Sequence, residues 1–247
     1  MLKDRRQSWI SRYLPGIVLI WVFFAQLTLG SLQLSITADE PAHIVNGYVA
    51  LTTGDTWALP THKHPPLLNA WSAWPILLQP DRPDPRLDSE WHQRWIPFIR
   101  SILPLLGPPD RLAFASRLPI ILLAVALMAL VYRWAADWFG HWGGVLAMAI
   151  MAWDPTMIAH SQLSTTDLGL ALFTFACLYL TSRLLRRFTW RLLVGVGLLL
   201  GLAMAAKISG LILVPVLAVR IGPTTAILRP GSRHRLTPSS AGRGSPG

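Results

Sequence analysis

Long runs of apolar residues, separated by short polar segments, dominate the hydrophobic pattern of this chain. The first run covers residues 14–36, and others cover about 118–134, 142–158 and 168–185. A helix that rises about 1.5 Å per residue needs about 20 apolar residues to cross the hydrocarbon core of a bilayer. The runs therefore predict transmembrane helices. The first is too long for a cleaved signal peptide, and no clear small-residue cleavage site follows it.

The last apolar stretch, residues 192–219, is interrupted by Lys207 and Ser209. A single helix over this stretch would be about 42 Å long, which exceeds the bilayer core unless the helix tilts strongly. Two short helices with Lys207 at the turn would instead return the basic tail to the side of the N-terminus. The second arrangement is favoured, and it predicts an all-α polytopic membrane protein with about six transmembrane helices.

A long mixed segment, residues 37–116, separates the first two apolar runs. Pro41 suits the first turn of a helix, and Gly54-Asp55 suits the turn at that helix's end. Residues 64–78, "HPPLLNAWSAWPILL", are apolar and rich in Trp but too short to span comfortably, which predicts an interfacial helix. Residues 80–95 are rich in Pro and Asp and predict a solvated loop.

The composition agrees with a membrane protein. Of the 247 residues, 52% are hydrophobic and only 14% are charged, whereas a soluble domain carries nearer a quarter. Several Trp residues stand where apolar runs end, as in the aromatic belts of membrane proteins. The formal net charge is +10. Nucleic-acid binding is excluded because the basic residues stand at the ends of apolar runs and form no separate domain. The single cysteine, Cys177, supports neither a disulfide framework nor a cysteine metal site.

The basic residues also predict the orientation in a cell (inner or plasma) membrane. Positive residues accumulate in cytoplasmic segments, and they stand before the first run and between the fourth and fifth: Lys3, Arg5, Arg6, Arg12, Arg183, Arg186, Arg187 and Arg191. We therefore expect a cytoplasmic N-terminus over 1–13, a transmembrane domain over 14–221 whose first extracytoplasmic loop is 37–116, and a disordered basic tail over 222–247. Both termini are expected in the cytoplasm.

This topology brings several ionisable residues to the extracytoplasmic face. Ionisable groups at membrane depth are candidates for function, and carboxylates beside cations suit a reaction that needs a base and a neutraliser of leaving-group charge. The candidates are Asp39, Glu40, His43, Lys63, His64, Asp167 and Lys207.

Each candidate also has a structural interpretation, which the pattern alone leaves open. Asp39 or Glu40 suits the N-cap of the helix that holds Pro41, although a cap requires only one carboxylate. His43 suits an interfacial position, Asp167 a cap of the helix after "STTD", and Lys207 a turn residue that snorkels. His62 and His64 form an H-x-H pair that would bind a metal with Glu40 or His43, a weak signal at this spacing.

Five stretches resemble, in order, the glycosyltransferase family 39. They are "DEPAHIVNGYVALTTGD", "HPPLLNAW", "ASRLPIILLAVALMALVYRWA", "DPTMIAHSQLSTTDLGLALF" and "GLLLGLAMAAKISGLILVPVL". The family comprises membrane enzymes with the GT-C fold, including protein O-mannosyltransferases and the lipid A aminoarabinose transferase. The resemblance covers about residues 10–220. Since family members commonly run to about twice this length, it implies that the chain corresponds to the N-terminal half.

The resemblance implies transfer of a monosaccharide from a polyprenyl-phosphate donor to a lipid, glycan or protein acceptor at the extracytoplasmic face. It assigns Asp39, with Glu40, to catalysis and implies that Asp39 is the general base. Lys63, His64 and Lys207 are then candidates to neutralise the phosphate, and Asp167, with His43, is expected to bind substrate. No cofactor is required with certainty, and a divalent metal stays open. The alternatives are a non-catalytic membrane protein, such as a transporter or assembly-partner fragment, and an inactive truncated family member.

Overall fold

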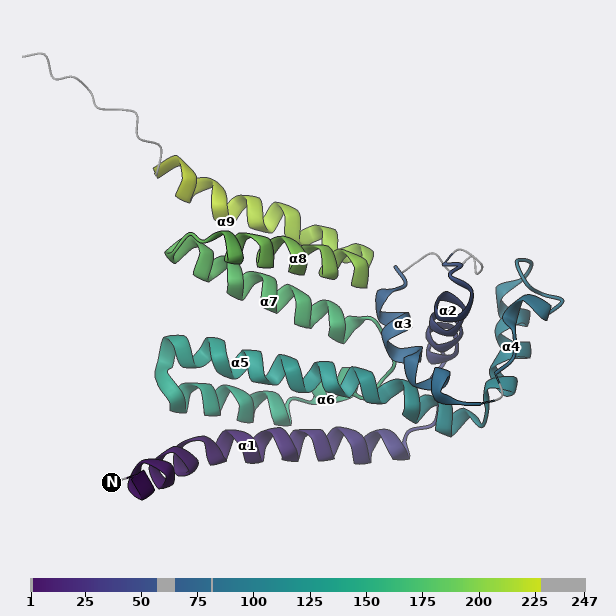
Figure 1. Cartoon of the computed structure of the whole chain (residues 1–247), viewed down its shortest axis with the longest axis horizontal. Coiled ribbons are helices and arrows are strands. Elements are labelled where there is room, and N and C mark those ends of the chain that lie inside the picture. Colours follow the sequence, from purple (N-terminus) through teal and green to yellow (C-terminus); the bar gives the residue numbers. More distant parts are fainter. Residues whose placement is uncertain (1, 57–64, 81, 228–247) are drawn as a thin grey trace, which may run out of the picture.

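The computed structural model describes residues 2–56, 65–80 and 82–227, with side chains from Arg12 to Arg220. Every regular element among the described residues is helical. Long helices lie side by side as a bundle, and the short helices α2, α3 and α4 gather at one end of it (Figure 1). We call this the loop end. The predicted disordered tail, 222–247, lies outside the described residues from 228 onward. Its first residues belong to helix α9, which continues to Ile227, beyond the expected boundary at 221.

Three described helical segments are long and apolar enough to cross a membrane. They are Arg12–Gln33 within α1 (Leu2–Gln33), α5 (Pro109–Trp153) and α7 (Asp167–Arg186). The shorter apolar helices include α8 (Trp190–Ala206) and the stretch Ile208–Arg220. Large apolar side chains remain exposed along these helices, for example Trp21 at 65% and Leu198 at 64%. The chain is therefore a multi-pass membrane protein, because several helices combine the length and apolarity needed to cross a bilayer with apolar surface that lipid can cover.

Helix α5 contains the second and third predicted spans. A straight helix of its 45 residues would be about 67 Å long, far more than a bilayer core. Gly140 interrupts it with φ of 74°, a left-handed conformation that glycine adopts without strain. The chain reverses there, so the two arms of α5 run side by side (Figure 1), and α1 packs against both of them. The third span was predicted over 142–158, but the helix ends at Trp153. The next residue, Asp154, caps the short helix α6 (Pro155–Ser161), because its side chain accepts from the Met157 amide at 2.7 Å.

The final apolar stretch is broken at Lys207, where the sequence places the turn. Lys207 has extended backbone angles and joins α8 to the 3-10 helix η3 (Ile208–Ile212), which leads into α9 (Leu213–Ile227). Gly210 permits this turn, since a Cβ there would lie 2.4 Å from the Ala203 carbonyl oxygen. The described C-terminal end of α9 returns to the end of the bundle where α1 begins (Figure 1).

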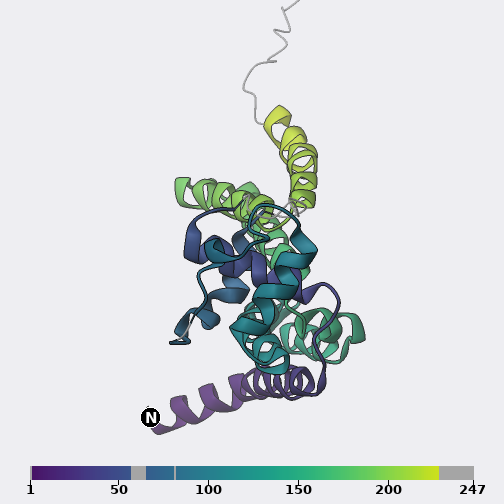
Figure 2. The same ribbon diagram turned by 90° about the vertical axis from the view of Figure 1, so that its right-hand side faces the viewer.

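The loop end has its own apolar core. Helix α2 (Glu40–Thr53) ends at Gly54 in the left-handed conformation, as predicted. Helix α3 (Leu67–Ala73) and the 3-10 helix η1 (Trp74–Leu78) occupy the predicted interfacial segment. The 3-10 helix η2 (Pro85–Leu87) and helix α4 (Trp95–Leu106) complete the group of short helices at the loop end. The sequence pattern predicted neither of them. Figure 2, which faces this end, shows α2, α3 and α4 covering it. Their core includes Ile44, Tyr48, Phe98 and Ile102.

Candidate active site

Glu40 lies at the centre of the loop end with a fully buried side chain. Arg117 of α5 binds its carboxylate in the bidentate manner, from Nε to Oε1 at 2.7 Å and from Nη2 to Oε2 at 2.6 Å. The backbone amides of Ser164 and Thr37 donate to the same group, each at 2.9 Å. One carboxylate thereby joins the end of α1, the start of α2, the start of α5 and the loop before α7.

These contacts hold Glu40 in its ionised form. Burial alone raises the pKa of a carboxyl, because it removes the charge from water. The hydrogen bonds from Arg117, Ser164 and Thr37 together outweigh that effect, so the pKa of Glu40 lies below its usual value of 4.5. A carboxylate that is already bonded on both oxygens to donors is a poor proton acceptor, and its geometry is that of an anchor.

Arg117 is a central residue that sequence reasoning missed. Its remaining N–H groups donate to carbonyl oxygens in the last turn of α1 and just beyond it: Nη1 to Ser31 at 2.9 Å and Leu34 at 2.8 Å, and Nη2 to Ser35 at 2.9 Å. These bonds satisfy carbonyls that a helix end leaves without partners, and they place a cation at the negative end of the helix dipole. The available signal was an arginine inside the apolar stretch "ASRLP", since such a charge requires a partner.

Asp39 differs from its neighbour Glu40 in burial and in hydrogen bonding. Its side chain is exposed, and the side chain makes no cap hydrogen bond to α2. The helix start is instead closed through the Asp39 backbone carbonyl, which accepts from the amides of Ala42 at 3.2 Å and His43 at 3.3 Å. Among the described residues, none forms a hydrogen bond or ion pair with the Asp39 carboxylate. The two adjacent carboxylates are thus divided between a buried anchor and a carboxylate that faces water.

A second ion pair lies at the same end of the bundle. Lys207 Nζ donates to Asp167 Oδ1 at 2.5 Å, and it joins the turn after α8 to the first residue of α7. The Lys207 side chain is 27% exposed and that of Asp167 is 44% exposed, so both remain accessible to a ligand. Thr166, not Asp167, occupies the N-cap of α7. The pair is linked to the Glu40 anchor through the loop before α7, because Ser164, which donates to Glu40, lies three residues before Asp167.

His43 is positioned by a neighbouring helix. Its Nδ1 hydrogen-bonds to Oδ1 of the buried Asn69 in α3 at 2.9 Å, which requires the proton on Nδ1. Helices α2 and α3 approach closely here because Gly47 has no side chain, and a Cβ at Gly47 would lie 2.0 Å from the Asn69 carbonyl oxygen. The histidine ring is therefore fixed relative to the helix that begins at Glu40.

Two predicted site residues, Lys63 and His64, lie outside the described residues, as does His62 of the proposed H-x-H pair. Within residues 2–56, 65–80 and 82–227, no three His, Cys, Asp or Glu side chains are grouped as metal ligands are. Both Glu40 oxygens already accept hydrogen bonds, and the His43 ring bonds to Asn69. The structure brings Asp39 and Glu40 to the same end as His43, Asp167 and Lys207.

A groove opens beside Asp39. It has a volume of about 440 Å³ and runs between the start of α2 and helix α4. Ala38, Pro41 and Ala42 line it on one side, which are the residues immediately around the two carboxylates. The α4 side is apolar except for Arg100, whose side chain is exposed. The groove therefore offers an apolar wall and one cation to a molecule that approaches Asp39.

Buried hydroxyl groups gather at the end of α6 and in the loop that follows it before α7. The hydroxyl oxygens of Ser161, Ser164 and Thr165 are shielded from solvent, and none has a hydrogen-bond partner among the described residues. A buried hydroxyl without a partner is costly. This loop lies between the Glu40 anchor and Asp167, so it places hydrogen-bonding capacity next to the site.

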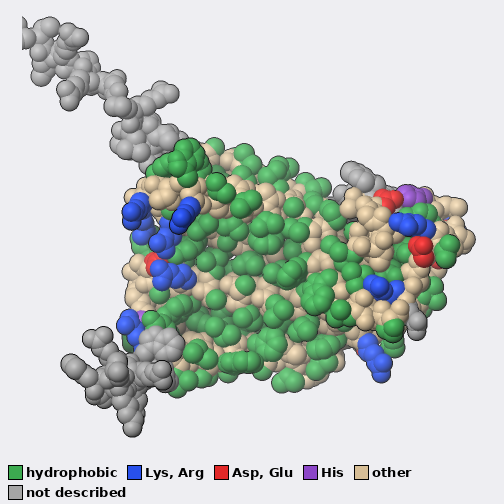
Figure 3. Space-filling model, viewed as in Figure 1, with side chains coloured by type: hydrophobic (Ala, Val, Ile, Leu, Met, Phe, Trp, Pro, Cys, Tyr) green, Lys and Arg blue, Asp and Glu red, His purple; other side chains and the backbone are tan. Residues whose placement is uncertain are grey.

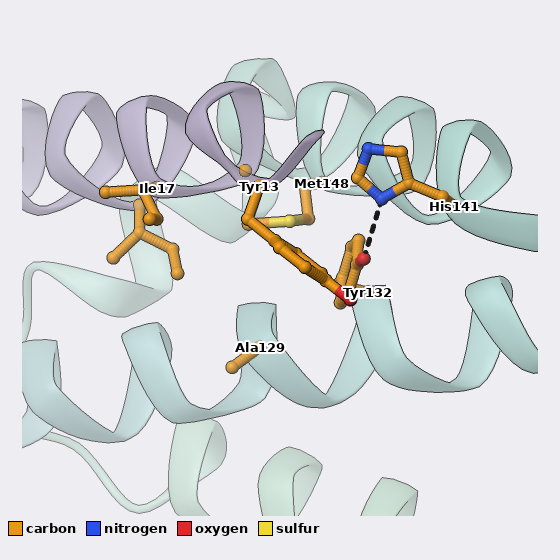
Figure 4. Close-up of a pocket in the computed structure, with 8 residues that line it drawn as sticks. Tyr13, Ile17, Ala129, Tyr132, His141 and Met148 are labelled. Atoms are coloured by element: carbon orange, nitrogen blue, oxygen red, sulfur yellow. Dashed lines mark hydrogen bonds between the residues drawn. The ribbon is translucent and has the colours of Figure 1, made fainter. Parts of the chain in front are cut away.

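A different cavity lies at the opposite end of the bundle, between α1 and the two arms of α5. It has a volume of about 140 Å³ and is lined by Tyr13, Ile17, Met148 and other mostly apolar residues. Figure 4 shows the Tyr132 hydroxyl directed at His141 Nδ1, at a distance of 2.8 Å. The cavity is separated from the loop end by the length of the bundle, and none of its described lining residues carries a carboxylate.

Comparison with protein families adds the deciding observation. The model of the dolichyl-phosphate-mannose-protein mannosyltransferase family matches residues 98–238, which is more than half of the chain. The chain belongs to this family. Membership makes it a glycosyltransferase-type membrane protein, in agreement with the resemblance drawn from the sequence. Searches among curated proteins and among solved structures each gave no match.

The family match covers one part of the candidate site. It includes Arg117, Asp167 and Lys207, and it begins after the segment that carries Asp39 and Glu40. The structure connects the two parts, because Arg117 from the matched region binds Glu40 from the unmatched one.

Proposed function

We propose that the chain transfers a single sugar from a polyprenyl-phosphate donor to an acceptor hydroxyl at the loop end, with Asp39 as general base. The family description names dolichyl-phosphate-mannose, which makes a mannosyl donor the first choice. The observation that carries the proposal is the contrast between an exposed Asp39 carboxylate and the buried Glu40 anchor directly beside it.

The proposed step is a single displacement at the anomeric carbon. The acceptor oxygen forms a bond to that carbon while the bond from the carbon to the phosphate oxygen breaks. The acceptor proton passes to Asp39, and the electron pair of the broken bond stays on the polyprenyl phosphate. Because the acceptor attacks from the face opposite the phosphate, the anomeric configuration inverts. An exposed carboxylate to which no described cation is bound suits this role, since its oxygens are available to the acceptor hydroxyl.

Lys207 is the described cation best placed to receive the departing phosphate. Its ammonium group donates to Asp167, and it has further N–H groups that can donate to a phosphate oxygen. Phosphate charge that grows in the transition state is stabilised by such a fixed donor. Asp167 fixes the position of Lys207. The roles of Lys63 and His64 stay predictions, because both residues lie outside the described part of the chain.

Glu40 acts as a positioning residue in this proposal. Its bonds to Arg117, Ser164 and Thr37 fix the backbone next to Asp39. A general base must stay within hydrogen-bond reach of its proton, so a rigid support contributes to the rate. The groove along α4 would admit the acceptor to Asp39, with Arg100 available to an anionic acceptor group.

The test is the Asp39→Asn substitution in the protein expressed in its native membrane. Asparagine keeps the size of the side chain and cannot accept the proton, so the rate of mannosyl transfer from a polyprenyl-phosphate mannose should fall by about 10²- to 10⁴-fold. Asp39 is exposed, so thermal stability should stay unchanged. The matched control is Asp110→Asn, another exposed carboxylate at the loop end. Wild-type transfer by the Asp39→Asn protein would show that Asp39 is not the base.

A further inference from the structure

The end of the bundle opposite the site carries a cluster of arginines, which we call the arginine end: Arg133, Arg183, Arg186, Arg187 and Arg191. Figure 3 shows Lys and Arg side chains gathered at this end, and a largely apolar surface separates them from the charged side chains of the loop end. The cluster is drawn from α5, α7, α8 and the turn between α7 and α8. Asp137 is the only acidic residue between 111 and 153, and none follows Asp167 in the sequence.

Two of these arginines are held side by side by one hydroxyl and one carboxylate. The hydroxyl of the buried Tyr179 accepts from Arg183 Nη1 at 2.9 Å and from Arg133 Nε at 3.3 Å, and it donates to Asp137 Oδ2 at 2.9 Å. Arg133 also pairs with Asp137 Oδ1 at 3.2 Å, and Arg183 approaches Oδ2 at 3.8 Å. A single carboxylate thus compensates two guanidinium groups, which leaves this pair positively charged.

Both guanidinium groups remain open to the outside. The Arg133 side chain is 58% exposed and that of Arg183 is 47% exposed. Fixed guanidinium groups with outward N–H donors match the oxygen atoms of a phosphate, which they bind in a bidentate manner. Because Tyr179 and Asp137 already hold these side chains, less conformational entropy is lost when an anion binds.

The surroundings indicate a lipid phosphate in preference to a free one. Large aromatic side chains are exposed at the same end, where membrane proteins meet the headgroup layer: Trp138, Phe139, Trp142, Phe188 and Trp190. Arg186 lies over the Trp138 ring at 4.6 Å from its centroid, which joins the cluster to this aromatic layer. Anionic headgroups are attracted to such basic segments.

We propose that the arginine end is a binding site for an anionic phospholipid, with the lipid phosphate between Arg133 and Arg183. Arg186, Arg187 and Arg191 surround the headgroup and add attraction at longer range. The site is separate from the loop end and does not depend on the proposed transfer reaction.

The test is a titration of the purified full chain in neutral detergent with short-chain phosphatidylglycerol, followed by native mass spectrometry. Parallel titrations use phosphatidylcholine of the same chain length and inorganic phosphate. We expect the wild-type protein to bind phosphatidylglycerol in preference to both. Arg133→Gln with Arg183→Gln should weaken phosphatidylglycerol binding by about ten-fold or more, because charge-assisted hydrogen bonds are lost.

The matched control is Arg82→Gln with Arg111→Gln, which removes the same charge from exposed positions at the loop end and should bind as the wild type does. An equal loss in this control, or wild-type binding in the Arg133/Arg183 variant, would overturn the proposal. Inorganic phosphate that binds as tightly as phosphatidylglycerol would overturn the assignment to a lipid. If the Gln variant fails to fold, the double variant Arg133→Lys with Arg183→Lys replaces it in the titration. This variant keeps the charge but loses the bidentate geometry, so wild-type affinity for phosphatidylglycerol would contradict the proposed site.

Discussion

At the scale of single residues, the environment of a carboxylate decides its role. Glu40 and Asp39 are chemically similar neighbours, yet one binds Arg117 in a buried ion pair and the other faces water. Loss of one partner from a buried pair is far more damaging than loss of an exposed one, because it leaves an unpaired charge away from water. We therefore propose that Glu40 supports the architecture of the site and that Asp39 carries out its chemistry.

This difference predicts the pH dependence of stability. The pKa of Glu40 is lowered in the folded state, so its ion pair stabilises the fold above the unfolded value of 4.5 and is lost as the pH falls through the lower, folded value. Glu40→Gln should destabilise the protein by about 3–5 kcal/mol at neutral pH and make the acid loss of thermal stability shallower. The matched control is Glu90→Gln, which breaks the exposed pair with Arg94 and should cost about 0.5 kcal/mol or less. Equal effects of the two substitutions would contradict the anchoring role.

At the scale of helices, close backbone approach positions the site. Helix α2 carries His43 and begins at Glu40, and it contacts α3 at Gly47, where the space for a side chain is already filled by the Asn69 backbone. The spacing between α2 and α3 therefore depends on a single residue without a Cβ. A shift between these helices would move His43 relative to Asn69 and would disturb the support of Asp39.

Gly47→Ala is expected to force α2 and α3 apart. The overpacking should cost about 1–3 kcal/mol and should lower transfer activity together with stability. Gly197→Ala is the matched control, because it lies in helix α8 with nothing within 4 Å of its added Cβ. Thermal unfolding and transfer assays on both variants make the comparison. A Gly47→Ala protein as stable and active as the Gly197→Ala protein would show that the contact is more adaptable than its geometry indicates.

At the scale of the whole molecule, the bundle separates two chemically different ends. The loop end holds the candidate-site carboxylates and the groove. The opposite end holds the arginine cluster, and Lys and Arg side chains are seen there in Figure 3. From the positive-inside rule we propose that the arginine end is cytoplasmic and the loop end extracytoplasmic. A polyprenyl-phosphate donor with its sugar on the outer face would then meet Asp39 without crossing the membrane again.

Thiol labelling tests this orientation. In intact cells, an impermeant reagent should label Leu87→Cys, a position that is 85% exposed at the loop end, and should not label Arg187→Cys at the arginine end. The native Cys177 is buried and should contribute no background. The opposite labelling pattern would place the candidate site in the cytoplasm and would exclude an extracytoplasmic donor.

The sequence by itself determined the helical, multi-pass character of the protein, the break at Lys207 and the start and end of α2. These features follow from hydrophobic runs and from local residues such as Pro41 and Gly54, which act on their own neighbourhood. The family was also recognisable from the order of short motifs.

Only the tertiary structure decided which of the two adjacent carboxylates is the anchor. That choice depends on Arg117, 77 residues further along the chain, and no local pattern records which distant cation will meet which carboxylate. The pairing of Lys207 with Asp167, across 40 residues, could not be predicted from the sequence for the same reason. Helix packing brings these groups together, and burial then makes the Glu40–Arg117 pair a fixed anchor.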